Sequence, residues 1–160
     1  MQRSNSEAVY QHSGLSAKRS VLKTRLQNNK EQIYCEWRHR WVRLTPEEWV
    51  RQQLLHRLTE LYGYPAGLMA VEVQISVGDA RRRCDAVVYD RAMQPLMLIE
   101  CKAETVALTQ RTLDQAATYN RRLCVPYLML HNGPATIVAR VAEDKIEYLE
   151  TIPEWNNISH

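Results

Sequence analysis

The sequence predicts an α/β fold with a mixed sheet of about five strands flanked by helices. Two short, β-prone apolar runs at 86–89 and 96–99 enclose a segment rich in turn residues, which is typical of a β-hairpin. A helical segment separates the second run from another apolar run at 125–130, and this order predicts a crossover between parallel strands. The chain has 160 residues, so we expect one domain, 21–155, with a single core. The polar segment 1–20 lacks periodicity and is expected to be a disordered leader.

Composition is that of an ordinary globular protein, with 45% hydrophobic and 24% charged residues. The net charge of +3 is only mildly basic and does not by itself demand a nucleic-acid partner. No apolar stretch reaches the roughly 20 residues that a membrane span needs, so no membrane partner is expected. The cysteines show no CxxC spacing, which argues against a zinc site or a disulfide framework and favours the reduced cytoplasm; they are Cys35, Cys84, Cys101 and Cys124.

Near the N-terminus, the apolar stretches 21–26 and 33–37 flank Asn28-Asn29-Lys30, and we expect a small hairpin with an Asn turn. The next segment, 37–41, reads Trp-Arg-His-Arg-Trp. Aromatic and basic residues together are typical of a nucleic-acid surface, but short basic patches are weak evidence. We therefore favour a half-buried connection into the first helix over a binding surface.

The first helix has a strong start signal in Thr45 as N-cap, Pro46 at the first position and Glu48 placed to complete a capping box. It is expected to reach about residue 62 and to stop at Gly63. Glu47 lies over the middle of the apolar stripe and is expected to point toward the sheet, whereas two glutamates that simply favour the positive helix end are an equally open alternative. The stripe comprises Val50, Leu54, Leu58 and Leu61.

Further elements follow from local patterns. Residues 68–77 alternate and predict a strand with its odd positions inward. Arg81 to Arg83 begin the next strand or its preceding turn, and they either contact phosphate or form a solvated run. Residues 105–122 predict a helix with Thr109 as a cap, and 135–141 a strand that follows His131. Residues 143–153 are expected to form an edge strand or a short cover. The packing face predicted for the helix comprises Leu113, Ala116, Ala117, Asn120 and Leu123.

Three charged residues bracket the central hairpin. Asp85 opens its first run, and Glu100 and Lys102 close the second. Side chains alternate along a strand, so Glu100 and Lys102 share a face, and antiparallel pairing brings Asp85 near Glu100. Two carboxylates at close range are costly unless something uses them, and Mg²⁺ with its oxygen ligands resolves the conflict. A lysine beside a metal-bound water suits phosphodiester hydrolysis.

These residues resemble the signature of the PD-(D/E)XK nucleases. The surrounding sequence is similar to small standalone proteins related to the N-terminal domain of type I restriction enzyme R subunits, over roughly residues 21–153. One departure is Cys84, which stands where such nucleases often carry proline. The supporting stretches are 44–52, 83–90, 98–103 and 114–120.

The resemblance implies a restriction-endonuclease-like fold and Mg²⁺-dependent hydrolysis of DNA, with Mn²⁺ as a substitute, in restriction or DNA repair. It implies that Lys102 positions the attacking water and that Gln115, in a Gln-x-x-x-Tyr motif with Tyr119, assists catalysis. DNA is the implied partner, and a homodimer or a partner protein is left open. The implied metal ligands are Asp85, Glu100, the Cys101 carbonyl and Glu47, and the implied DNA contacts are Arg81, Arg82, Arg83 and Tyr119. The rival interpretation is a catalytically inactive nucleic-acid-binding or protein-interaction module with the same fold.

Overall fold

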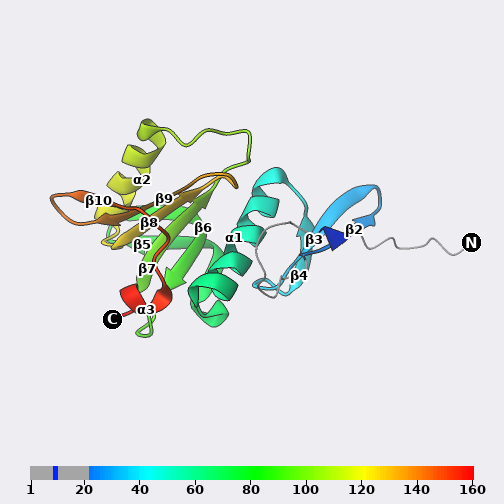
Figure 1. Cartoon of the computed structure of the whole chain (residues 1–160), viewed down its shortest axis with the longest axis horizontal. Helices are drawn as coiled ribbons and strands as arrows, with labels where there is room; N and C mark the ends of the chain where they lie inside the picture. The colour runs from blue at the N-terminus through cyan, green and yellow to red at the C-terminus, as the bar shows by residue number, and fades with distance from the viewer. Residues whose placement is uncertain (1–8, 11–21) are drawn as a thin grey trace, which may run out of the picture.

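The computed structural model describes residues 9–10 and 22–160 and arranges their strands in two sheets (Figure 1). The larger sheet has six strands in the order β10-β9-β8-β7-β6-β5. All neighbouring pairs are antiparallel except β7 and β8, which are parallel. The predicted α/β class and mixed sheet are confirmed, with one strand more than expected. The strands are β5 (Met69–Val77), β6 (Ala80–Tyr89), β7 (Pro95–Cys101), β8 (Tyr127–His131), β9 (Thr136–Val141) and β10 (Ile146–Leu149).

The smaller sheet is antiparallel, in the order β1-β2-β3-β4. Asn28 and Asn29 turn β2 into β3 with φ of 52° and 59°, a left-handed conformation that asparagine tolerates, so the predicted Asn turn is confirmed. The expected leader, 1–20, lies outside the described residues except at 9–10, which form β1. The sequence did not predict β4. The strands are β1 (Val9–Tyr10), β2 (Leu22–Gln27), β3 (Lys30–Cys35) and β4 (Arg40–Arg43).

Helix α1 (Pro46–Tyr62) lies between the two sheets, and α2 (Gln110–Arg122) lies on the opposite side of the larger sheet (Figure 1). Gly63 ends α1 at φ 73°, as expected of a left-handed C-cap. Thr109 caps α2, as predicted, because its Oγ1 accepts from the backbone N–H of Thr112. The helix begins only there, so the prediction of a helix from residue 105 was too long. Two short helices, η1 (Ala66–Leu68) and α3 (Trp155–Ile158), complete the fold.

The core is divided between the two faces of the larger sheet. On the α1 face, Val50, Leu54 and Leu58 of the helix pack against strands β6 to β9. Leu61, predicted to join them, is exposed, and Leu55 is buried instead. On the α2 face, the predicted packing residues are buried as expected, among them Leu113, Ala116, Ala117, Asn120 and Leu123. Within the described residues, no helix combines the length and the apolar character that crossing a membrane requires.

Candidate functional site

The N-terminus of α1 carries a buried carboxylate toward the larger sheet. Thr45 Oγ1 accepts from the Glu48 backbone N–H at 3.1 Å, which confirms the predicted cap. The side chain of Glu48 turns inward and is buried, whereas Glu47 is exposed. Glu47, predicted to point toward the sheet, is exposed and lines the same cleft as Asp85, whereas the buried face of the helix includes Glu48, Arg51 and Gln52 one turn apart.

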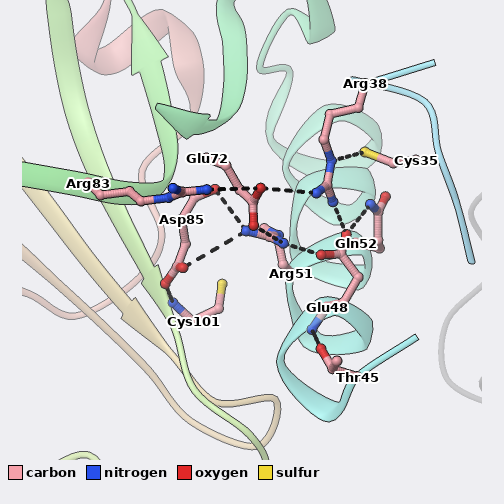
Figure 2. Close-up of polar contacts among 10 residues, drawn as sticks. All are labelled: Cys35, Arg38, Thr45, Glu48, Arg51, Gln52, Glu72, Arg83, Asp85 and Cys101. Atoms are coloured by element: carbon pink, nitrogen blue, oxygen red, sulfur yellow. Dashed lines mark hydrogen bonds and ion pairs between the residues drawn. The ribbon is translucent and has the colours of Figure 1, made fainter. Parts of the chain in front are cut away.

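Two arginines and an amide surround the Glu48 carboxylate, as Figure 2 shows. Arg38 and Arg51 each form an ion pair with it, and Gln52 Nε2 donates to Oε1 at 2.7 Å. Burial alone would raise the pKa of Glu48, but the hydrogen bonds from Gln52, Arg51 and Arg38 outweigh burial and hold the pKa below its ordinary value. Glu48 is thus a charged structural link between α1, the small sheet and the larger sheet.

Arg51 extends this network to β5 and β6. Its Nη1 donates to the backbone oxygen of Asp85 at 3.3 Å and lies 3.9 Å from Asp85 Oδ1, while its Nη2 lies 3.5 Å from Glu72 Oε1. Arg38 and Arg83 also pair with Glu72, at 3.4 and 3.3 Å. The carboxylates of Glu48, Glu72 and Asp85 are therefore joined through arginines, chiefly Arg51 (Figure 2).

The backbone is irregular at Glu72 and Asp85. Glu72 has φ 52°, although it is neither glycine nor asparagine, and the register passes from Val71 opposite Ala86 to Val73 opposite Cys84. The strands also change phase there. On a regular strand, residues two apart face the same side. On β6, however, Cys84 packs on the α2 face, with Leu123 and Val125, and Ala86 packs on the α1 face. On β5, Val73 likewise packs on the α2 face and Val71 on the α1 face.

The phase change aims Asp85 into a cleft of about 330 Å³ between α1, the small sheet and the larger sheet. Asp85 Oδ2 accepts from the Cys101 backbone N–H at 2.8 Å, so the carboxylate touches the middle of the Glu100-Cys101-Lys102 segment. Its side chain is 41% exposed. Burial raises the pKa of the Cys101 thiol to about 12, so that thiol stays protonated. The cleft is lined by Arg38, Val42, Arg43, Thr45, Glu47, Glu48, Arg51, Glu72, Asp85 and Cys101.

Glu100 faces the other side of the sheet. Its neighbours Ile99 and Cys101 belong to the α1-face cluster and Leu98 to the α2-face cluster, so alternation points Glu100 toward α2. There its carboxylate pairs with Arg82. The expected convergence of Asp85 and Glu100 side chains is thus absent, although their backbones adjoin, next to the pair Ala86 and Ile99. Lys102 follows the end of β7, where its backbone N–H donates to the His131 oxygen at 2.8 Å, and it does not line the cleft.

The other predicted site residues are dispersed. The guanidinium carbon of Arg82 lies 4.6 Å from the Tyr119 ring centre on the α2 face. Arg83 pairs with Glu72 at the cleft, and Arg81 is exposed on β6. Gln115 is exposed on α2, outside the cleft. The three consecutive arginines therefore do not form one surface.

The sequence assigned no site role to Arg38 or Arg51, and for Glu72 it left open whether the side chain lines the cleft or a solvated face; all three line the cleft. Arg51 follows Glu48 by three positions on the helix, and that spacing is a signal for an ion pair. Arg38 stood in the Trp-Arg-His-Arg-Trp segment, whose interpretation as a half-buried connection fits its side chain, which is 13% exposed. Nothing in the sequence signals the left-handed backbone of Glu72.

An ion such as Mg²⁺ does not fit the arrangement as it stands. Oxygen ligands must converge on one point, but Asp85 and Glu100 face opposite sides of the sheet and Glu48 is already held by two arginines. Within residues 22–160, no three His, Cys, Asp or Glu side chains gather closely enough to hold a metal. The cleft offers the exposed carboxylates of Asp85, Glu47 and Glu72 beside the buried, arginine-paired carboxylate of Glu48.

The mixed sheet, its crossover helix α2 and the acid-lined cleft define an α/β domain with a charged site on one sheet face. The family model described as Type I restriction enzyme R protein N terminus (HSDR_N) matches residues 46–153, and the chain belongs to this family. Membership links it to restriction systems and so to a DNA-related role. The comparison with curated proteins found no match. The wider PD-(D/E)XK assignment stays a prediction, and the small sheet precedes the matched range.

Proposed function

We propose that the protein is a metal-dependent endonuclease that hydrolyses phosphodiester bonds in DNA, in restriction or DNA repair. Family membership supports the link to DNA restriction. The observation that supports hydrolysis is the phase change at Glu72 and Asp85. It directs the exposed carboxylate of Asp85 toward a cleft lined by further acids. Irregular strand pairs and left-handed non-glycine residues are enriched beside active sites, because they re-aim a side chain at a cost in strain.

In this proposal the metal ligands would be Asp85, Glu100, the Cys101 carbonyl and Glu47. The ion, Mg²⁺ or Mn²⁺, would act as a Lewis acid, while Lys102 would position the attacking water and Gln115 would assist. The proposal has a geometric requirement, since Glu100 must leave Arg82 and turn to the cleft side of the sheet. A single site cuts one strand, so duplex cleavage requires a second copy or a partner protein. The proposed location is the cytoplasm, because the four cysteines lack a disulfide pattern.

A second candidate is a catalytically inactive module that binds nucleic acid or protein. The observation that favours it is the separation of Asp85 from Glu100 on opposite faces, together with the arginines that neutralise Glu48 and Glu72. In such a module the charged residues of the cleft stabilise the fold, and no metal ion is needed.

Metal binding separates the two candidates. Calorimetry with Mg²⁺ and Mn²⁺, in the presence and absence of DNA, is expected to detect an ion in the wild type and none in Asp85→Asn, which keeps the acceptor for the Cys101 N–H. Cleavage of linear, branched and single-stranded DNA is then measured in the same buffer. Asp79→Asn is the matched control, because Asp79 is an exposed aspartate in the turn between β5 and β6.

The outcomes are distinct. Loss of metal binding and of cleavage in Asp85→Asn, with both retained in Asp79→Asn, supports the nuclease. A wild-type protein that binds neither ion, even with DNA present, refutes the nuclease and leaves the inactive module as the better account.

A further inference from the structure

The small sheet presents an outward face that differs from the face it turns to α1. Thr24, Ile33 and Val42 lie side by side in register on the inner face; Ile33 is fully buried, and Val42 lines the cleft. Trp37 anchors this side through an edge-to-face contact with His56 of α1, at 5.0 Å between ring centres. Alternation therefore directs the intervening residues of β2, β3 and β4 away from α1.

These intervening residues combine cations with aromatic rings. Arg25, Gln32 and Arg43 form one row across the three strands, and Tyr34 lies opposite Trp41 in the next. Lys23 and Lys30 are exposed on the same face near either end of the hairpin. We call this set the basic-aromatic face: Lys23, Arg25, Lys30, Tyr34, Trp41 and Arg43.

The aromatic part of the face is preorganised. The guanidinium carbon of Arg25 lies 4.3 Å from the Trp41 ring centre, and Arg25 Nε donates to Gln32 Oε1 at 2.7 Å. Tyr34 and Trp41 meet edge to face with ring centres 5.5 Å apart. Held planar groups of this kind lose little conformational entropy when a ligand stacks on them.

The face is also of one charge. Four of its six residues are cationic, and the two acids within 22–43 lie elsewhere: Glu31 alternates with Gln32 on β3, and Glu36 lies in the loop before β4. Arg43 belongs to this face and also borders the Asp85 cleft. A polyanion bound across the three strands would thus reach the rim of that cleft.

We propose that the basic-aromatic face binds a single-stranded nucleic acid. Lysines and arginines take the phosphates, and unpaired bases stack on aromatic rings and guanidinium planes, as on other sheet platforms. In a duplex the bases are stacked on one another, so only its phosphates could contact this surface. The inference goes beyond the proposed nuclease and does not depend on it, since the face lies outside the family range and holds no group of the cleaving site.

The test measures binding by the full chain in EDTA, where metal-dependent cleavage is impossible. Fluorescein-labelled oligothymidylate and oligouridylate of about twelve nucleotides, a length within the usual site sizes, are titrated by anisotropy beside a duplex of equal length. At least one single strand is expected to bind more tightly than the duplex. Comparison of oligothymidylate with oligouridylate shows whether the face prefers DNA or RNA. No binding to either strand, or tighter binding to the duplex, overturns the proposal.

Two kinds of variant separate charge from stacking. The double variant Lys23→Glu/Lys30→Glu is expected to reduce the slope of log affinity against log salt by about 1.4, because each phosphate that a lysine no longer neutralises lowers that slope by about 0.7. Trp41→Ala is expected to weaken binding about tenfold, whereas Trp41→Tyr keeps a stacking ring and stays within about threefold of the wild type. Circular dichroism checks the fold, and if Trp41→Ala unfolds, the tyrosine and lysine variants decide.

The matched control reverses two exposed charges on turns of the larger sheet, Arg91→Glu/Lys145→Glu. An equal loss in this control overturns the proposal, because it makes the attraction one of overall charge. Binding of an acidic polypeptide as tight as that of the oligonucleotide overturns it too. Asp85→Asn is expected to bind the strand like the wild type, so a failed nuclease and a failed binding face give different results.

Discussion

The two faces of the larger sheet accommodate charge in different ways. On the α1 face, one buried carboxylate, Glu48, is shared by two arginines and an amide and is linked through them to Glu72 and Asp85. On the α2 face, Arg82 and Glu100 form an ion pair beside the ring of Tyr119. We call the α1 face the network face, because its charges are linked in a network, and the α2 face the pair face, because it holds one ion pair.

This contrast shows how a single irregular position divides a predicted site. β5 and β6 change phase at Glu72 and Asp85, but β7 keeps a regular alternation from Met97 to Cys101. Asp85 therefore joins the charged network on the α1 face while Glu100, adjacent across the strands, is left on the α2 face. Both the network face and the pair face are expected to be sensitive to the loss of a charge, because Arg82 and Glu100, at 14% and 16% exposure, are nearly as buried as Arg38 at 13%.

The largest effect is expected from Glu48→Gln. The change leaves Arg38 and Arg51, both mostly buried, without a full counter-charge, and breaking a buried pair in this way costs about 3–5 kcal/mol. Urea unfolding followed by circular dichroism measures it. Glu47→Gln is the matched control on the adjacent exposed glutamate and is expected to change stability by less than about 0.5 kcal/mol. Equal effects would mean that Glu48 does not hold the network together.

The next largest effect is the pH dependence of stability that comes from His131, which the fold keeps neutral. Burial, and after it the charge of Arg57, lowers the pKa of His131 to about 4, and Nδ1 lies 2.7 Å from Thr136 Oγ1. An unfolded histidine titrates near 6.5, so the stabilisation is complete above that pH and is lost as pH falls toward 4. The expected loss is about 3 kcal/mol over this window.

Unfolding measured from pH 7 to 4 tests this expectation against His131→Gln, which cannot titrate. The variant should show a shallower fall in stability with acid. It keeps a part of the slope, because burial also lowers the pKa of His56. Identical slopes in the two proteins would show that His131 is not held neutral by the fold.

Much of the fold could be predicted because local signals agreed with the tertiary structure. The cap at Thr45, the stop at Gly63, the Asn turn and the packing face of α2 are each encoded within one turn or one helical repeat. The parallel pairing of β7 and β8 followed from the helix between them. These features depend on a few adjacent residues, so a single sequence suffices.

The site could be predicted only in part. Asp85, predicted as a site residue, lies in the cleft, but its predicted convergence with Glu100 requires regular alternation on both strands. That assumption fails at Glu72, which has φ 52° and pairs with Arg38, Arg51 and Arg83. Ion pairs between residues so far apart in the sequence produce no local sequence pattern from which they could be predicted.

The smallest effect is expected on the pair face, at the Tyr119 ring beside Arg82. Tyr119→Ala removes the ring beside Arg82 but leaves the ion pair with Glu100, so the loss should be the cation–π contribution of about 0.5–1 kcal/mol. Urea unfolding measures it, Tyr119→Phe should restore most of it, and Gln115→Ala, an exposed position one turn earlier, should change nothing measurable. A loss as large as that of Glu48→Gln would show that Arg82, Glu100 and Tyr119 form a network of their own. In that case Glu100 would not leave Arg82 easily, and the rearrangement that the nuclease proposal requires would lose its support.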